Sequence, residues 1–173
     1  MPTSGVAPAV VEMLKQDHEK VKGLFEQFEE AEGREQAEIA KTAIQELEVH
    51  AQLEEKLIYP AIREEIDEDE KMNEALEEHH LVHVLIGELK KIKPSDERFQ
   101  AKFSVMSELV KHHIEEEEGE ILPKAEESNL DWDELETQVM KKKEQLMSKA
   151  KSGRSMSNSR SSQRRGSARR KSR

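Results

Sequence analysis

A histidine and a glutamate four residues apart occur twice in this sequence of 173 residues, as HAQLE at residues 50–54 and as HIEEE at residues 113–117. In an α-helix, residues four apart lie on one face, roughly 40° around and about 6 Å along the axis from each other, so both side chains can reach one metal site. A proline follows each histidine after ten residues, at Pro60 and Pro123. This doubled spacing indicates a repeated helical unit.

Two further histidines belong to the same repeat. His18 and His79 each follow an acidic residue and precede a valine by three positions. The length of chain from His18 to His79 is nearly the same as the length from His50 to His113. The repeat therefore predicts two helical hairpins of similar arm length, which bring all four histidines to one level of a bundle, since each helical residue rises by about 1.5 Å.

Apolar residues spaced three and four apart predict an all-α fold. The expected helices cover about residues 9–30, 35–65, 70–92 and 96–127, with a shorter fifth helix ending near residue 149. Gly33 ends the first helix, Pro60 is expected to kink the second, and Ser95 is expected to cap the fourth. No stretch alternates with period two. We expect an up-down-up-down antiparallel four-helix bundle with a short extra C-terminal helix and a disordered basic tail.

The charge divides the chain into segments. The net charge is −10, but residues 148–173 hold ten Lys/Arg and no Asp/Glu, so the remainder is near −20. We expect a lead-in over residues 1–8, the bundle over 9–128, the additional helix over 129–149 and a Ser/Arg-rich disordered tail over 150–173. The basic residues 148–173 make nucleic acid a candidate partner, and association of the tail with the acidic bundle is the alternative.

The composition excludes several classes of protein. The sequence has no cysteine, so disulfides, thiolate nucleophiles, iron–sulfur clusters and cysteine-ligated zinc are ruled out. Any metal must be held by nitrogen and oxygen. The N-terminal stretch has no basic region and Pro8 interrupts its short apolar run, so neither a signal peptide nor a membrane-spanning helix is indicated. We expect a cytoplasmic monomer or weak oligomer without membrane contact.

Seven polar residues fall on the apolar faces of the predicted helices. They are His18, His50, Glu54, His79, His83, His113 and Glu117. A single buried histidine is ordinary, but burying five imidazoles and two carboxylates without compensation costs several kcal/mol per charged group. A dinuclear divalent metal centre would remove that penalty. On the fourth helix, His112 and Glu118 offer an alternative register. His80 and His112 are read as surface or supporting residues, and Tyr59 and Trp132 as structural.

The pattern His, His-x-x-x-Glu, His, His-x-x-x-Glu over about residues 10–127 resembles the hemerythrin-like (HHE cation-binding) family. The pair His79 and His83 is similar to the third helix of the oxygen-carrying hemerythrins. The resemblance implies two iron ions joined by an oxo or hydroxo bridge. His79, His83 and His113 would hold one iron, His18 and His50 the other, and Glu54 and Glu117 would bridge them. A ferritin-like site is disfavoured because it needs Glu-x-x-His pairs and glutamates where this sequence has histidines.

The resemblance and the tail lead to three functional hypotheses. The first is a non-haem di-iron protein that binds or senses dioxygen, iron, nitric oxide or redox state. The second is a catalase-like or peroxidase-like di-iron enzyme that consumes peroxide. The third is a nucleic-acid-associated protein that acts through residues 148–173. The sequence leaves open which ligand is physiological and whether manganese or zinc replaces iron.

Overall fold

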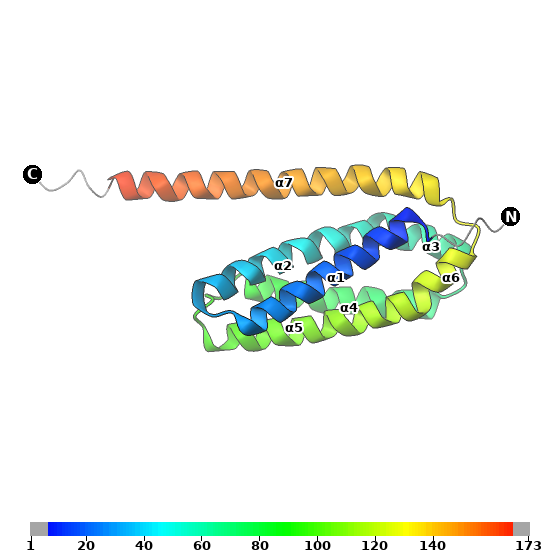
Figure 1. Ribbon diagram of the computed structural model, residues 1–173, viewed down its shortest axis with the longest axis horizontal. Helices are drawn as coiled ribbons and strands as arrows, with labels where there is room; N and C mark the ends of the chain where they lie inside the picture. Colours follow the sequence, from blue (N-terminus) through cyan, green and yellow to red (C-terminus); the bar gives the residue numbers. More distant parts are fainter. Residues whose placement is uncertain (1–6, 168–173) are drawn as a thin grey trace, which may run out of the picture.

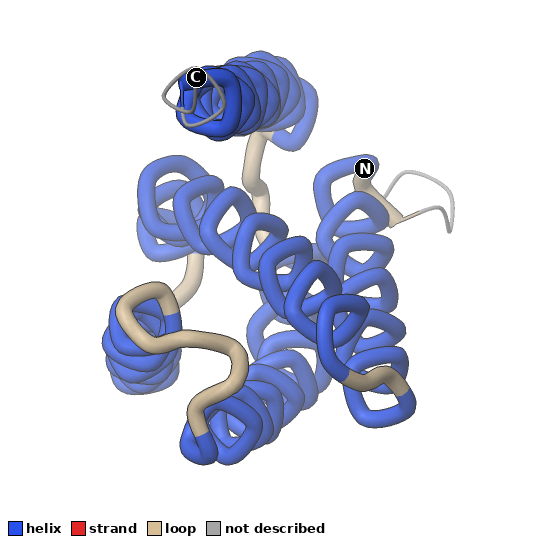
Figure 2. Tube along the Cα trace, turned by 90° about the vertical axis from the view of Figure 1, so that its left-hand side faces the viewer, coloured by secondary structure: helices blue, strands red, loops and turns tan. Residues whose placement is uncertain are grey.

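The structure, a computed structural model, describes the backbone of residues 7–167 and the side chains of residues 7–150. Its described part is helical, without strands. The elements are α1 (Ala9–Glu30), α2 (Gly33–Leu53), η1 (Glu54–Ile58), α3 (Tyr59–Glu65), α4 (Asp69–Leu89), α5 (Glu97–Glu116), η2 (Glu117–Ile121), α6 (Leu122–Glu127) and α7 (Trp132–Ser167). The helices α1, α2, α4 and α5 form an antiparallel bundle, and α7 lies along its outside (Figure 1, Figure 2). The predicted all-α bundle is confirmed.

Two π-turns interrupt the long helices at equivalent places. The η1 turn joins α2 to α3, and the η2 turn joins α5 to α6. The N–H of Tyr59 bonds to the carbonyl of Glu54, five residues earlier, and the N–H of Leu122 bonds to Glu117 in the same way. A proline follows Tyr59 and Leu122, and a proline ring crowds the carbonyl four positions back. The wider π-turn accommodates that ring, so the distortion expected at Pro60 takes the form of a π-turn.

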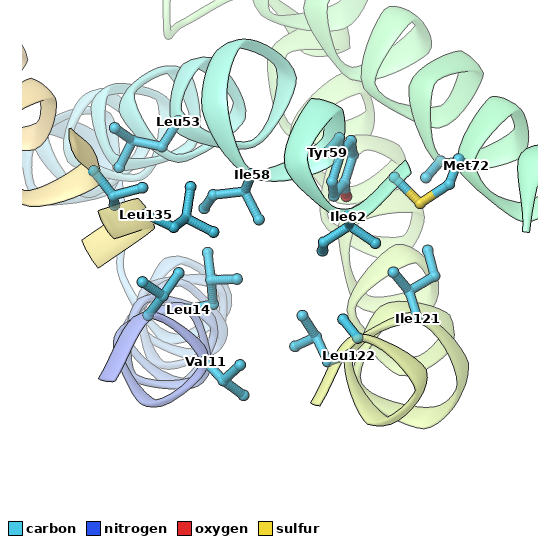
Figure 3. Packing of buried hydrophobic residues seen from close by; sticks show 14 of the residues in the cluster. Val11, Leu14, Leu53, Ile58, Tyr59, Ile62, Met72, Ile121, Leu122 and Leu135 are labelled. Atoms are coloured by element: carbon cyan, nitrogen blue, oxygen red, sulfur yellow. The ribbon is translucent and has the colours of Figure 1, made fainter. Parts of the chain in front are cut away.

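Buried apolar residues form two clusters along the bundle. The first hydrophobic cluster includes Val10, Val11, Leu14, Leu53, Ile58, Tyr59, Ile62, Met72, Ile121, Leu122, Leu135 and Val139. Figure 3 shows much of its packing. The second hydrophobic cluster includes Val21, Phe25, Phe28, Leu47, Val82, Ile86, Phe99, Phe103, Met106 and Val110. Phe28 stacks on Phe103 with ring centroids 3.9 Å apart. The buried histidines and glutamates of α1 to η2 lie at the level where these two clusters meet.

The helix ends agree with the sequence in part. The first helix already ends at Glu30, not at Gly33; Gly33 is the first residue of α2 and has a φ of 57°, in the left-handed region that favours glycine. Asp96, rather than Ser95, caps α5, because its carboxylate accepts the N–H of Arg98 at 2.9 Å. Asp131 caps α7 and accepts the N–H of Glu134 at 3.0 Å.

The extra helix is longer than expected. We expected it to end near residue 149, whereas α7 continues to Ser167. No proline follows residue 123, so no residue in this region forces a helix to stop. The last part of the expected tail, residues 168–173, lies outside the described residues. Disorder of the tail from residue 150 stays a prediction.

Candidate metal centre

Six of the seven candidate residues converge inside the bundle. They are His18 of α1, His50 of α2, Glu54 of η1, His79 of α4, His113 of α5 and Glu117 of η2. All six are buried, and the two glutamates are fully so, with an exposure of 0%. Each glutamate is the first residue of a π-turn, one helical turn beyond its histidine. The repeat read from the sequence thus places its two halves around one site.

The first group of candidate ligands comes from both halves of the chain. His18, His50, Glu54 and Glu117 place one ligand atom each within 4.8 Å of one another. The Nε2 atoms of His18 and His50 lie 3.1 Å apart. Oε1 of Glu54 lies 2.9 Å from Nε2 of His50, and Oε2 of Glu117 lies 3.2 Å from Nε2 of His18. Two imidazoles and two carboxylates therefore face a common point.

The second group consists of Glu54, His79 and His113. The Nε2 atoms of the two histidines are again 3.1 Å apart, and Oε2 of Glu54 lies 3.3 Å from Nε2 of His79. Glu54 therefore faces both groups, one oxygen toward each. This is the placement that a bridging carboxylate requires.

A carboxylate lies beside the outer nitrogen of each buried histidine. Oε1 of Glu118 is 2.6 Å from Nδ1 of His18, Oε1 of Glu55 is 3.1 Å from Nδ1 of His79, and Oε2 of Glu78 is 2.8 Å from Nδ1 of His113. Oδ2 of Asp17 is 3.5 Å from Nδ1 of His50. The three closer carboxylates favour a proton on Nδ1 of His18, His79 and His113, which leaves Nε2 of these histidines free to bind a metal.

The inner atoms fit a cation better than they fit one another. Two facing Nε2 atoms at 3.1 Å cannot both carry a proton, and two bare lone pairs at that distance repel. All four carboxylate oxygens of Glu54 and Glu117 are buried without a hydrogen-bond partner, although imidazole nitrogens lie near them. Buried unpaired carboxylates are costly, and a divalent cation shared with the imidazoles removes that cost. The donor set therefore fits metal ions.

The pKa shifts of the buried histidines and of Glu54 also indicate a site that can bind a cation. Burial lowers the pKa of His50, but Glu54 and Asp17 outweigh it and raise the pKa to about 10. The pKa of His79 is also raised, since Glu54 and Glu55 more than offset burial. Burial raises the pKa of Glu54, yet His50 and His79 bring it well below its usual value. Without metal, the site holds negative carboxylates beside protonated imidazoles, and a cation can replace those protons.

Tyr59 is a site residue that the sequence reasoning missed. Its hydroxyl lies 3.2 Å from Nε2 of His113, and its ring stacks on His79 with centroids 5.6 Å apart. Burial and the negative charge of Glu117 raise the pKa of Tyr59 well above its usual value, so the phenol keeps its proton. Its place directly before Pro60 was the available signal, but the equivalent residue before Pro123 is a leucine.

His83 does not join the two groups. Its side chain is 41% exposed, and its Nε2 lies 2.9 Å from Oε1 of Glu55, the carboxylate that also holds His79. In η2, the carboxylate of Glu117 lies beside the inner nitrogen of His18, Nε2, and the carboxylate of Glu118 lies beside its outer nitrogen, Nδ1. His80 is exposed, and His112, 60% exposed, lies 3.7 Å from Glu78 and Glu116.

A small cavity adjoins the histidines on the side of the second hydrophobic cluster. Its volume is about 30 Å³. Asp17, His18, Val21, Leu47, His50, Ala51, His79, Val82, His83, Ile86, Val110, His113 and Ile114 line it. A space of this volume admits a molecule the size of one or two waters. Glu54, Glu117 and Tyr59 do not line the cavity, so imidazoles, apolar side chains and Asp17 surround whatever enters it.

Comparison with known proteins agrees with this geometry. The family model of the Hemerythrin HHE cation binding domain matches residues 9–125. The chain therefore belongs to the hemerythrin HHE cation-binding domain family, as its sequence pattern predicted. Within the described residues, the His/Glu groups inside the bundle are where such a domain can hold its cations.

Two known proteins are similar to this chain. A crystal structure of a Hemerythrin HHE cation binding domain-containing protein from Mycobacterium kansasii is 25% identical, with a TM-score of 0.70, over 84% of this chain and 90% of that one. A protein of Nostoc sp. (strain PCC 7120 / SAG 25.82 / UTEX 2576) named DNA nickase is 25% identical over 111 residues. The match covers 64% of this chain but spans only 31% of that relative's length. Separately, none of the described helices has the length and apolarity needed to cross a membrane.

Proposed function

We propose that this protein holds two iron ions and uses them to bind or sense a small ligand such as dioxygen or nitric oxide. His18, His50, Glu54 and Glu117 would hold one ion, and Glu54, His79 and His113 the other. The observation that carries the proposal is the pairing of buried Nε2 atoms at 3.1 Å around carboxylate oxygens that lack hydrogen-bond partners. An iron pair supplies electrons and an open coordination position for a diatomic ligand.

The donor set supports iron. Imidazole and carboxylate ligands suit divalent iron, manganese and zinc, whereas the absence of cysteine rules out thiolate sites. Membership of the HHE cation-binding family, whose sequence pattern implied an iron pair, favours iron among these. Two ions are favoured over one because the buried ligands form two groups that share Glu54.

The cavity supports a small ligand. Its volume of about 30 Å³ suits a diatomic molecule and is too small for an organic substrate. Its walls contain no lysine, arginine, serine or tyrosine. Turnover of peroxide needs a proton donor near the reacting oxygens, and His83, which lines the cavity and belongs to neither ligand group, is the imidazole that would supply it. The enzymatic alternative therefore depends on His83, whereas binding of a small ligand needs no proton donor.

Metal analysis with a visible spectrum tests the proposal. The protein is produced with added iron, and its iron, manganese and zinc are measured per chain. We expect two irons per chain and absorption bands of an oxo-bridged pair that change when dioxygen or nitric oxide is added to the reduced protein. A chain that binds no iron, or that holds iron but shows no spectral response to either gas, would refute the proposal. Rapid peroxide consumption without a lasting ligand-bound form would assign the enzymatic alternative instead.

A further inference from the structure

Lys143 of α7 reaches the metal centre from outside the four-helix bundle. Its Nζ lies 2.8 Å from Oδ1 and 2.7 Å from Oδ2 of Asp17. Asp17 is the carboxylate beside Nδ1 of His50. A chain of polar contacts thus runs from α7, through Asp17, to a candidate metal ligand.

This contact makes the two halves of the centre unequal. Asp17 and Glu78 occupy equivalent places in the repeat, directly before His18 and His79. Glu78 lies 2.8 Å from Nδ1 of His113, whereas Asp17 lies 3.5 Å from Nδ1 of His50, which has no hydrogen-bond partner. Among the described residues, Asp17 is the one of the four outer carboxylates that a lysine salt bridge engages. Lys143 thus contacts both oxygens of the carboxylate that faces His50.

Packing of α7 fixes this lysine in place. Leu135 and Val139 are buried in the first hydrophobic cluster, and Figure 3 shows Leu135 beside Leu53 and near Leu14. Lys143 follows Val139 by four residues, on the same face of the helix. Its side chain is only 23% exposed. The helix α7 also contacts η1, the turn that carries Glu54.

We propose that Lys143 is a positioning residue through which docking of α7 weakens the hold on the metal ion at the position of His18, His50, Glu54 and Glu117. A carboxylate hydrogen-bonded to the outer nitrogen orients a metal-ligating histidine and makes it a stronger donor. By engaging both oxygens of Asp17, Lys143 withholds that support from His50. Its positive charge also opposes a cation nearby. This inference rests on the proposed metal centre.

Linkage makes the effect reciprocal. If docking of α7 lowers metal affinity at this position, metal at this position lowers the stability of the docked helix by the same factor. Loading with metal should therefore increase the hydrogen-exchange rate of backbone amides in residues 135–147. The same loading should leave that rate unchanged once the ammonium group of Lys143 is removed.

Release of iron to excess chelator, followed over time from the iron-loaded full-length protein, tests the coupling. The Lys143→Met variant keeps the long apolar stem and loses the charge. We expect it to slow release of one of the two ions by about tenfold, the lower end of the range for outer partners of metal-bound histidines, and to leave the other ion unchanged. A loosened fold would accelerate release, so structural damage cannot imitate this result.

Three further variants complete the test. Lys143→Arg keeps the charge and should match the natural protein. Lys141→Met removes an exposed charge from the same helix and should also have no effect. Adding Asp17→Asn to Lys143→Met should abolish the slowing, since the amide is a weaker acceptor for His50.

The outcomes separate the coupling from the proposed function. Equal or faster release in Lys143→Met, or slowing of both ions, would overturn the coupling. A natural chain that binds no metal would overturn the proposed function itself.

Discussion

The hydroxyl of Tyr59 lies 3.2 Å from Nε2 of His113, on the side of that histidine where the second group of ligands faces inward. The repeat has no counterpart to this contact, because the residue nine positions after His50 is tyrosine and the residue nine positions after His113 is Leu122. The two halves of the site thus differ in the phenol oxygen of Tyr59, which lies beside the second group and has no equivalent beside the first. The second group has three candidate protein ligands, and the phenol stands beside them.

Replacing Tyr59 with phenylalanine should weaken the second metal position selectively. The ring keeps its packing against His79, but the hydroxyl beside Nε2 of His113 is lost. In an anaerobic titration with ferrous iron, we expect the second equivalent to bind more weakly while the first equivalent binds as before. Unchanged binding of both equivalents would show that the hydroxyl contributes nothing to the metal position.

The two buried glutamates should differ in their effect on metal content. Glu54 faces both groups, whereas Glu117 faces His18 of the first group. Glu54→Gln should therefore reduce iron from two per chain toward none, and Glu117→Gln should reduce it toward one. Glu115→Gln, at an exposed position on α5, is the matched control and should retain two. Iron measured per chain decides, and retention of two ions in Glu54→Gln would exclude it as the bridge.

His83 should be dispensable for metal binding. It contacts Glu55 and is partly exposed, so it supports His79 from outside the inner site. We expect His83→Ala to keep two irons per chain and His79→Ala to lose at least one, with exposed His80→Ala as the control. Because His83 lines the cavity, its removal should also speed binding of nitric oxide to the reduced protein in stopped-flow measurements. Loss of one iron from His83→Ala would restore it as a ligand.

The bundle could be predicted from the sequence because each of its main patterns occurs twice, once in each half of the chain. Apolar residues three and four apart located the four long helices, and the nearly equal offsets between the paired histidines brought them to one level. The spacing of α4 was ambiguous. Its buried face contains Ala75 and Val82, so His83 falls beside that face. The repeat could have resolved this ambiguity. The offset that relates His79 to His18 relates His83 to Lys22, so His83 has a lysine rather than a histidine as its counterpart in the first half.

Other features had no repeated signal. Tyr59 has no partner in the second half, so it looked like an isolated core residue. The contact between Lys143 and Asp17 joins residues 126 positions apart and depends on how α7 docks, which helical periodicity does not specify. The π-turns arise from competition between Pro60 or Pro123 and the helix, and a proline alone predicts only that some distortion occurs.

The basic C-terminal region should account for any nucleic-acid binding. Residues 148–173 hold ten Lys/Arg and no acidic residue, while the rest of the chain is strongly acidic and should repel DNA. We expect the full chain to be retained on immobilised DNA at low salt and released as salt rises, and a chain ending at Met147 to pass through. Both should hold the same amount of metal. Equal retention of the two chains would assign binding to the bundle, and no retention of either would remove nucleic acid as a partner.

Metal-free protein should become less stable as the pH rises from about 6.5 toward 10. The pKa of His50 is raised from 6.5 to about 10 in the folded chain, so its contribution to stability is complete below 6.5 and is lost as the pH rises through 10. The pKa of Glu54 is lowered in the folded chain, so Glu54 stabilises the fold fully above its usual pKa of 4.5. That contribution to stability is lost as the pH falls below 4.5.

The affinity for metal should instead increase as the pH rises. The ions displace the imidazole protons, and those protons become easier to remove at higher pH. The difference in melting temperature between metal-loaded and metal-free protein should therefore widen from pH 6 to pH 9. Thermal unfolding of both forms at pH 6, 7.5 and 9 measures it. A His50→Gln variant, which lacks the shifted imidazole, should show a smaller change with pH in its metal-free form. A difference that stays constant or narrows with rising pH would contradict the exchange of protons for metal at this site.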